Sequence, residues 1–142
     1  MSTVLLSRIH HPVTNLGFGA RIGIWLQGCT IGCLGCVSRD TWPAVESTRA
    51  TVRSITDAVT THLDGLDGVT ISGGEPTDQP AGLHALLTGL RGVIGPDRDI
   101  LVYTGRSLAD SCARVPVLRS AADVVISEPF VAALADDSAL RG

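Results

Sequence analysis

The segment GCTIGCLGCVSRDTW, residues 28–42, decides how the rest of this 142-residue sequence is interpreted. It contains Cys29, Cys33 and Cys36 in the spacing C-x3-C-x2-C, so three of the four cysteines fall within eight residues. Thiolates this close in sequence can converge on one metal site, because a short loop costs little entropy to close. Three thiolates suit a [4Fe–4S] cluster in which one iron has no protein ligand, and that open iron is where chemistry can occur.

Zinc binding and disulfide formation remain open as alternatives for these cysteines. A zinc site would take His10 or His11 as its fourth ligand, although closed zinc sites usually pair two C-x2-C knuckles and this segment has one. Disulfides would pair poorly among three cysteines within eight residues, and the N-terminus MSTVLLSRIHH is too short and interrupted for a secretory signal. The spacing favours an iron–sulfur cluster over both.

Composition limits the class of protein. Hydrophobic residues make up 44% and charged residues 18%, which predicts a packed globular domain, and 142 residues suffice for one domain spanning 1–142. The net charge of −3 provides no basic stripe, so we expect no nucleic-acid partner. No apolar run reaches the roughly eighteen residues of a membrane helix. We therefore expect a cytoplasmic protein without membrane association, in a compartment where thiols stay reduced and can hold iron.

Hydrophobic periodicity predicts strands that alternate with helices. The predicted strands are residues 4–9, 21–26, 68–72, 99–103 and 123–127, and the predicted helices are residues 48–63, 80–91 and 107–114. Ser47 is the expected N-cap of the first helix, and residues 14–19 are an expected turn. This alternation predicts an α/β fold with parallel strands and right-handed crossovers, whose functional loops follow the carboxyl ends of the strands.

Two further segments follow predicted strands. The first is Ser72-Gly73-Gly74-Glu75-Pro76, where two glycines let the backbone approach a ligand and Glu75 supplies a negative charge for a ligand ammonium group. The second is 103–105, Tyr-Thr-Gly. Taken alone, each segment also fits an ordinary glycine turn. In the first segment that alternative would leave the Glu75 side chain in solvent.

The cysteine spacing, together with the Gly-Gly-Glu-Pro segment about forty residues later, resembles the paired motifs of the radical S-adenosylmethionine (SAM) superfamily. Gly35 before the third cysteine, and Thr41-Trp42 after it, resemble one branch, the anaerobic ribonucleotide reductase activating proteins. The resemblance extends over nearly the whole chain. It implies an incomplete, open (βα) barrel of the radical SAM type with mostly parallel strands.

The resemblance also implies a site and an activity. Its cluster ligands would be Cys29, Cys33 and Cys36, its SAM-binding residues Gly73, Gly74, Glu75 and Pro76, and its pocket-bordering residues Tyr103, Thr104 and Gly105. The cluster would cleave SAM reductively to methionine and a 5′-deoxyadenosyl radical, with no catalytic residue beyond the cluster. The radical would abstract hydrogen from a glycine of a partner enzyme such as anaerobic ribonucleotide reductase, with electrons from a donor such as flavodoxin or ferredoxin. The alternatives are a peptide or small-metabolite substrate, or a non-catalytic iron–sulfur module.

The sequence departs from the family pattern at three places. Residues 30–32, Thr-Ile-Gly, stand where many members have a histidine, and Ser127-Glu128 stands where Asp-Gly often precedes Pro129-Phe130. Family members also continue past the Arg141-Gly142 that ends this sequence, so we expect that the family's C-terminal segment is missing. Outside the motifs, Cys112 is predicted to be a buried structural thiol, and His62 and His84 are predicted to be surface or packing residues.

Overall fold

The computed structural model describes residues 1–128. Its elements, in chain order, are β1 (Thr3–Val13), β2 (Arg21–Leu26), the 3₁₀ helices η1 (Arg39–Thr41) and η2 (Glu46–Thr48), β3 (Arg49–Thr51), α1 (Val52–Thr61), β4 (Gly68–Gly73), the 3₁₀ helix η3 (Pro76–Asp78), α2 (Pro80–Ile94), β5 (Asp99–Tyr103), α3 (Leu108–Arg114), α4 (Leu118–Ala121) and β6 (Val124–Ile126).

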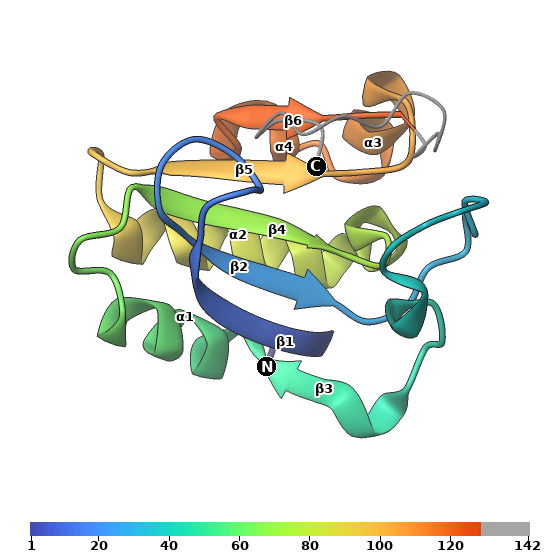
Figure 1. The fold of residues 1–142 in the computed structure, drawn as a ribbon, viewed down its shortest axis with the longest axis horizontal. Coiled ribbons are helices and arrows are strands. Elements are labelled where there is room, and N and C mark those ends of the chain that lie inside the picture. The colour runs from blue at the N-terminus through green and yellow to red at the C-terminus, as the bar shows by residue number, and fades with distance from the viewer. Residues whose placement is uncertain (129–142) are drawn as a thin grey trace.

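The six strands form one open sheet in the order β3-β1-β2-β4-β5-β6. Strands β2, β4, β5 and β6 are parallel, whereas β1 runs antiparallel to both of its neighbours, β2 and β3. The sheet is twisted, its helices lie behind it, and the arrows of the parallel strands end on the same side (Figure 1). The predicted α/β fold with a mostly parallel, unclosed sheet is therefore confirmed for the described residues.

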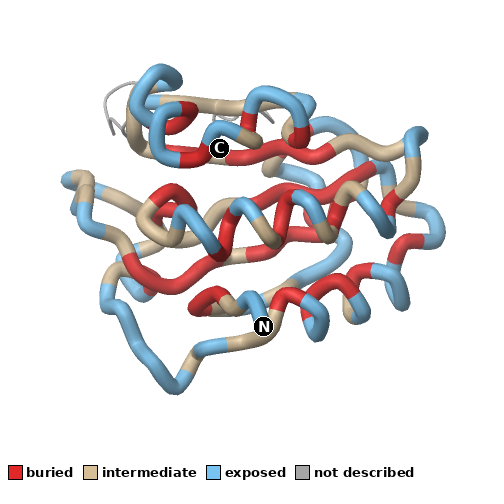
Figure 2. The backbone as a smooth tube through the Cα atoms, turned by 180° about the vertical axis from the view of Figure 1, so that it is seen from behind, coloured by how far each residue is buried: buried red, intermediate tan, exposed pale blue. Residues whose placement is uncertain are grey.

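The core lies between the sheet and the helices. Ile22, Ile24 and Leu26 alternate along β2 and are completely buried, as period-2 patterning predicts. They meet the apolar face of α2, which is formed by Leu83, Leu86, Leu87 and Leu90. Seen from behind, the buried residues follow the strands and the sheet-facing sides of the helices (Figure 2). Each such side chain contributes about 1.5–3 kcal/mol to folding by leaving water.

Several element boundaries differ from those predicted. The first helix begins at Val52 instead of residue 48, because residues 49–51 pair with β1, and Thr51 rather than Ser47 caps the helix by accepting a hydrogen bond from the Ser54 N–H. Strand β1 is longer than predicted, and β3 and α4 were not predicted at all. Helix α2 continues through Gly92 and ends before Gly95, whose φ of 78° suits glycine.

Arg21 is a buried cation that the sequence did not reveal. Its side chain is 1% exposed and donates hydrogen bonds to Thr70 Oγ1 at 2.7 Å and to the carbonyl oxygens of Phe18 and Val69, both at 3.0 Å. It also pairs with the Asp99 carboxylate. Arg21 lies at the end of the sheet where the parallel strands begin. Its hydrogen bonds and ion pair compensate for burying the charge.

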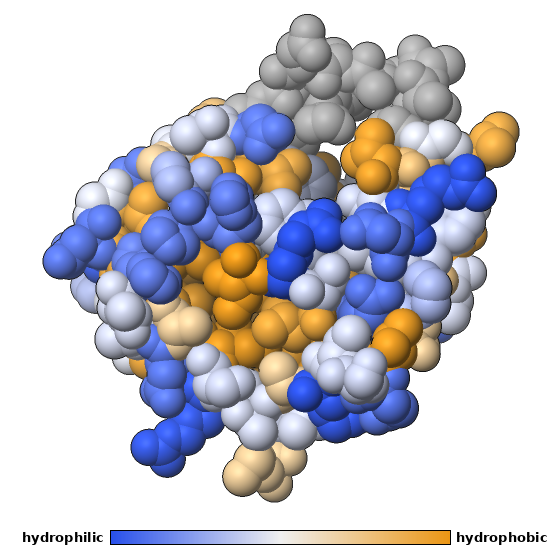
Figure 3. Space-filling model, turned by 60° about the horizontal axis from the view of Figure 1, so that its bottom comes forward, coloured by the Kyte–Doolittle hydropathy of each residue, from blue (hydrophilic) through white to orange (hydrophobic). Residues whose placement is uncertain are grey.

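The surface is mixed in polarity. When the bottom of the molecule is turned forward, apolar side chains gather near the middle of the view and hydrophilic ones surround them (Figure 3). Within residues 1–128, no helix combines the length and the hydrophobicity that crossing a membrane requires.

Candidate functional site

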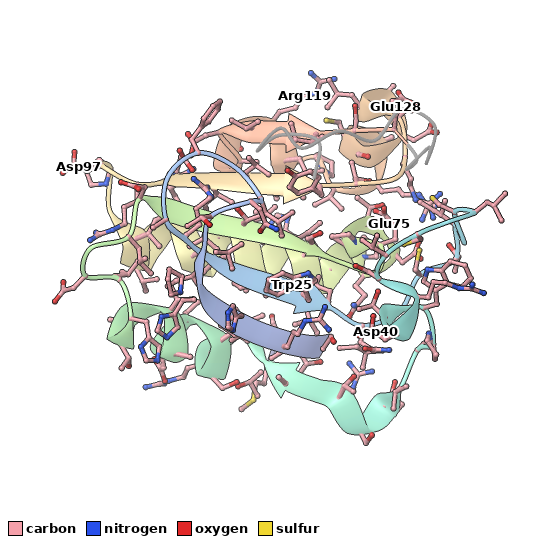
Figure 4. The ribbon with its side chains drawn as sticks, in the orientation of Figure 1. Trp25, Asp40, Glu75, Asp97, Arg119 and Glu128 are labelled. Carbon is pink, nitrogen blue, oxygen red and sulfur yellow. The ribbon has the colours of Figure 1, made fainter. Side chains whose placement is uncertain are left out.

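Three loops meet at the carboxyl ends of the parallel strands. They are the cysteine loop (residues 28–42) after β2, the glycine turn (residues 73–78) after β4, and the loop of residues 104–107 after β5. Glu75 lies at the end of the sheet toward which the parallel strands point, and Asp97 lies at the opposite end (Figure 4). In open α/β sheets this carboxyl edge is where ligands bind.

The cysteine loop is closed at its base by backbone hydrogen bonds. The Gly28 N–H donates to the Thr41 carbonyl at 2.6 Å, and the Cys29 N–H donates to the Trp42 carbonyl at 2.9 Å. The Gln27 side-chain amide adds bonds to the carbonyls of Asp40 and Pro43, at 3.1 and 2.7 Å. The Thr41-Trp42 pair therefore returns the chain to the start of the loop, which gives a structural reason for its position after the cysteines.

The cysteines of this loop are free thiols. Cys29, Cys33 and Cys36 are each half-buried, and Cys36 Sγ accepts a hydrogen bond from the Ser38 N–H at 3.4 Å. In residues 1–128 no three His, Cys, Asp or Glu side chains are close enough together to hold a metal ion, so the loop gathers the sulfurs without focusing them on one point. Gly32 and Gly35 have φ of 63° and 76°, conformations that favour glycine and bend the chain between the cysteines.

This donor set fits an iron–sulfur cluster better than zinc or disulfides. The thiols are unpaired and share one short loop, as three-cysteine ligation requires. His10 pairs with Gly23 in the middle of the sheet, and the His11 ring stacks on the His62 ring at 4.1 Å, so neither histidine belongs to the cysteine loop. Cys112 is buried in the core as predicted, while His62 and His84 lie at the surface.

The glycine turn touches the cysteine loop through backbone atoms. The Glu75 N–H donates to the Gly28 carbonyl, and the Gly74 N–H donates to the Leu26 carbonyl, both at 2.9 Å. A Cβ atom at Gly74 would lie 2.2 Å from the Gly28 oxygen, and one at Gly73, whose φ is 103°, would lie 2.4 Å from the Leu26 backbone. Both glycines are therefore required for this contact.

The Glu75 carboxylate points into the protein. It is 1% exposed and accepts hydrogen bonds from the Thr77 N–H (2.9 Å), the Thr77 hydroxyl, the Thr104 hydroxyl (2.8 Å) and the Gly105 N–H (2.7 Å). Three of these hydrogen bonds end on Oε2 and one ends on Oε1, so both carboxylate oxygens are held by groups of the protein. Glu75 therefore joins the glycine turn to the loop after β5, and Thr104 and Gly105 take part in the site as its bonding partners.

Tyr103 ends β5 next to this loop. Burial raises the pKa of its phenol, with the Arg21 charge acting in the opposite direction, so the hydroxyl stays protonated at neutral pH. Pro76 is buried at the start of η3. Of the departures from the family pattern, Glu128 has a φ of 83°, a conformation that favours the glycine often found there, while Pro129 and Phe130 lie outside the described residues.

Sequence reasoning missed Thr77, Asp78 and Arg106. Asp78 pairs with Arg106 and accepts two hydrogen bonds from Thr30, and Arg106 also donates to Thr77 Oγ1. Partial burial alone would raise the pKa of Asp78, but the hydrogen bonds from Arg106 and from Thr30 outweigh burial and hold it below its usual value. The only sequence feature that could have indicated a role for these residues is their position directly after residues 72–76 and 103–105.

Comparison with known proteins agrees with this geometry. A family model described as a 4Fe-4S single cluster domain matches residues 15–142. The anaerobic ribonucleoside-triphosphate reductase-activating protein of Vibrio cholerae is 32% identical over 126 residues, which is 84% of this chain and 80% of that protein. The pyruvate formate-lyase-activating enzyme of Staphylococcus aureus is 36% identical over 90 residues, or 57% of this chain and 36% of that protein.

The site and these matches define a radical SAM domain with a single [4Fe–4S] cluster. More narrowly, the chain belongs to the family of anaerobic ribonucleoside-triphosphate reductase-activating proteins. The predicted family and its two cofactors, the cluster and SAM, are thus confirmed.

A solved structure resembles the fold. The crystal structure of QueE from Escherichia coli matches with a TM-score of 0.60 and 21% identity, over 72% of this chain. The chain spans about half, 53%, of that protein. This likeness supports the incomplete barrel.

Proposed function

We propose that this protein uses a [4Fe–4S] cluster and SAM to generate a glycyl radical on a partner enzyme. The observation that carries the proposal is the backbone contact between the cysteine loop and the glycine turn, where Gly74 has no room for a side chain beside the Gly28 carbonyl. A cluster held by Cys29, Cys33 and Cys36 would then lie beside the turn. When bound, the cluster supplies the electron that cleaves SAM.

The described residues would orient SAM mainly through the backbone. Glu75 is almost completely buried and accepts four hydrogen bonds from the protein, so its carboxylate does not face an open site where a ligand ammonium group could bind. We assign the ligand contacts to the backbone of Gly73 and Gly74, and we assign to Glu75 the task of holding that backbone in place. Tyr103, Thr104 and Gly105 would border the ligand from the neighbouring strand.

The partner we propose is a glycyl-radical enzyme, because relatives are named as activators of anaerobic ribonucleoside-triphosphate reductase and of pyruvate formate-lyase. The tip of the cysteine loop supports a protein partner, since the Leu34 and Val37 side chains are 93% and 87% exposed beside the cysteines. An external flavodoxin or ferredoxin is the proposed electron donor. We further propose that residues 1–142 form one domain in the cytoplasm.

The test is anaerobic reconstitution with iron and sulfide, followed by SAM cleavage and electron paramagnetic resonance with a candidate reductase. Replacing Cys29, Cys33 or Cys36 with Ala should each abolish the cluster, and Cys112→Ala should retain it, because Cys112 is in the core. A glycine-centred signal that requires SAM, cluster and reductase together is the expected result. If an intact cluster cleaves SAM but no reductase gains the signal, a peptide or small-molecule substrate replaces the activating role.

Leu34→Asp tests the contact with the partner. It should weaken activation of the reductase about tenfold, the effect of losing one apolar contact in an interface. SAM cleavage without the partner should not change, because the Leu34 side chain is 93% exposed and is not among the proposed cluster or SAM contacts. Equal activation by wild type and Leu34→Asp would place the partner elsewhere.

A further inference from the structure

The part of the cysteine loop that lies between the first and third cysteines has one polar attachment to the rest of the protein. Among the described residues, Thr30 alone in the segment 30–36 makes hydrogen bonds to groups outside the loop. Its N–H donates to Asp78 Oδ2 at 2.8 Å, and its hydroxyl donates to the same oxygen at 2.9 Å. Thr30 directly follows the first cysteine, so this attachment controls where the loop goes next.

Asp78 is itself held by an arginine from a third loop. Arg106 Nη2 lies 2.5 Å from Asp78 Oδ1 and 3.3 Å from the Thr30 hydroxyl oxygen, and Arg106 Nε donates to Thr77 Oγ1 at 3.1 Å. The side chains of Arg106 and Asp78 are 20% and 14% exposed, so water competes weakly with the pair. Hydrogen bonds between charged groups are the stronger kind, and the planar guanidinium fixes several partners at once.

We propose that the Asp78–Arg106 ion pair positions the cysteine loop for cluster binding by holding Thr30. The proposal rests on the assignment of the cluster to this loop. Asp78 comes from the glycine turn and Arg106 follows Gly105, so the loop that holds the iron ligands is fixed to both segments that line the SAM side. Asp78 and Arg106 are positioning residues, because neither has been placed in contact with iron or SAM.

The chain contains a matched control for this ion pair. Asp123 also accepts one hydrogen bond from an arginine, Arg91 Nη2 at 2.6 Å, and one from a backbone N–H, that of Ile100 at 2.9 Å. This second pair joins α2 to the segment before β6, away from the cysteine loop. Asp78→Asn and Asp123→Asn therefore each remove an arginine ion pair and a carboxylate that accepts from a backbone N–H, one at the site and one remote from it. Asp78 is the less exposed of the two, at 14% against 46%, and it alone also accepts from a hydroxyl, that of Thr30.

The experiment first measures hydrogen exchange of the hydrogen-bonded amides in residues 29–36 of the cluster-free protein, which are those of Cys29, Thr30 and Cys36. Asp78→Asn should speed exchange in this segment about tenfold, the effect of weakening one charge-assisted hydrogen bond, whereas Asp123→Asn should leave it unchanged. Thr30→Val, which keeps the N–H donor and loses the hydroxyl, should give a smaller increase. In reconstituted protein, the rate at which a chelator removes iron should follow the same order.

Two results would overturn the proposal: equal exchange in Asp78→Asn and wild type, or equal acceleration in Asp78→Asn and Asp123→Asn, which would mean general destabilisation. Failure of the proposed function is a separate result. It would appear as wild-type protein that binds no cluster or does not cleave SAM, while exchange in the cluster-free protein still decides whether Asp78 holds the loop.

Discussion

Glu75→Gln separates a structural role of the glycine turn from direct contact with SAM. The carboxylate accepts hydrogen bonds on both oxygens: one from the Gly105 N–H on Oε1, and three from Thr77 and Thr104 on Oε2. A glutamine amide keeps one accepting oxygen and replaces the other with an NH₂ group. Because an NH₂ group only donates, at least one of the donors around this side chain loses its partner.

The glutamine amide can take two orientations. The less unfavourable one places its NH₂ group at the Oε1 position, facing the Gly105 N–H. In the opposite orientation it would face the Thr77 N–H and two hydroxyl oxygens, which already accept hydrogen bonds from Arg106. One buried donor without a partner costs about 1–3 kcal/mol, and the bonds that remain are weaker to a neutral acceptor. We therefore expect a loss of about 2–4 kcal/mol in the free energy of unfolding, a large part of the 5–15 kcal/mol typical of a domain.

Urea denaturation of the cluster-free protein measures this loss. The midpoint should fall by about 1–2 M, given a denaturant slope of roughly 2 kcal/mol/M, the middle of the range for small proteins. Glu46→Gln, at an exposed carboxylate paired with Arg49, should leave the midpoint close to that of wild type. SAM affinity of the reconstituted Glu75→Gln protein should fall only as far as the turn is loosened. Unchanged stability together with abolished SAM binding would refute the structural role of Glu75, because it would show that the carboxylate contacts the ligand directly.

Substitutions at four other positions test the same structure. Gly74→Ala should lower both iron uptake and SAM affinity, because its Cβ would lie only 2.2 Å from the Gly28 carbonyl oxygen and would push that backbone away. Gly92→Ala should retain both, because no atom lies within 4 Å of its Cβ, and should stabilise α2 by about 0.5–1 kcal/mol. Glu128→Gly should raise the free energy of unfolding by roughly 1 kcal/mol in urea titrations, because φ is 83° there, and Glu128→Ala should give no such gain. The lowered pKa of Asp78 means that its ionised form stabilises the fold above about pH 3.9 and that this contribution disappears as the pH falls through the folded-state pKa. The unfolding midpoint should accordingly depend less on acid pH in Asp78→Asn than in wild type.

Local sequence patterns predicted the parts of the fold that depend on local chemistry. The period-2 run Ile22, Ile24 and Leu26 and the helical face of α2 both lie where predicted, because burial against one partner layer produces each pattern. The start of α1 was wrong, since residues 49–51 extend the sheet instead of the helix. Their pairing with β1, more than forty residues earlier in the chain, leaves no local pattern that a sequence could show.

The site was predictable to the same degree. Cysteine spacing and paired glycines have a visible pattern because each meets a local requirement: several ligands in one loop, and a backbone without side chains. The sequence also identified Glu75 as a site residue, but it could not predict which way the Glu75 carboxylate faces. A carboxylate that follows two glycines can face a ligand or the protein. Two of the four hydrogen bonds that hold it in the protein come from Thr104 and Gly105, about thirty residues away.

Arg106 and Asp78 show why residues that connect two motifs, here called joining residues, could not be predicted from the sequence. Motifs mark where a ligand would bind, whereas the contacts between motifs arise only when the parallel strands bring their carboxyl ends to one edge. Once β2, β4 and β5 are adjacent, three loops carrying Thr30, Asp78 and Arg106 must pack together, and their polar groups need partners or water. Satisfying those groups with one ion pair couples the geometry of the cysteine loop to that of the glycine turn. Substitutions at such joining positions should therefore impair iron and SAM binding together, while the motifs themselves stay intact.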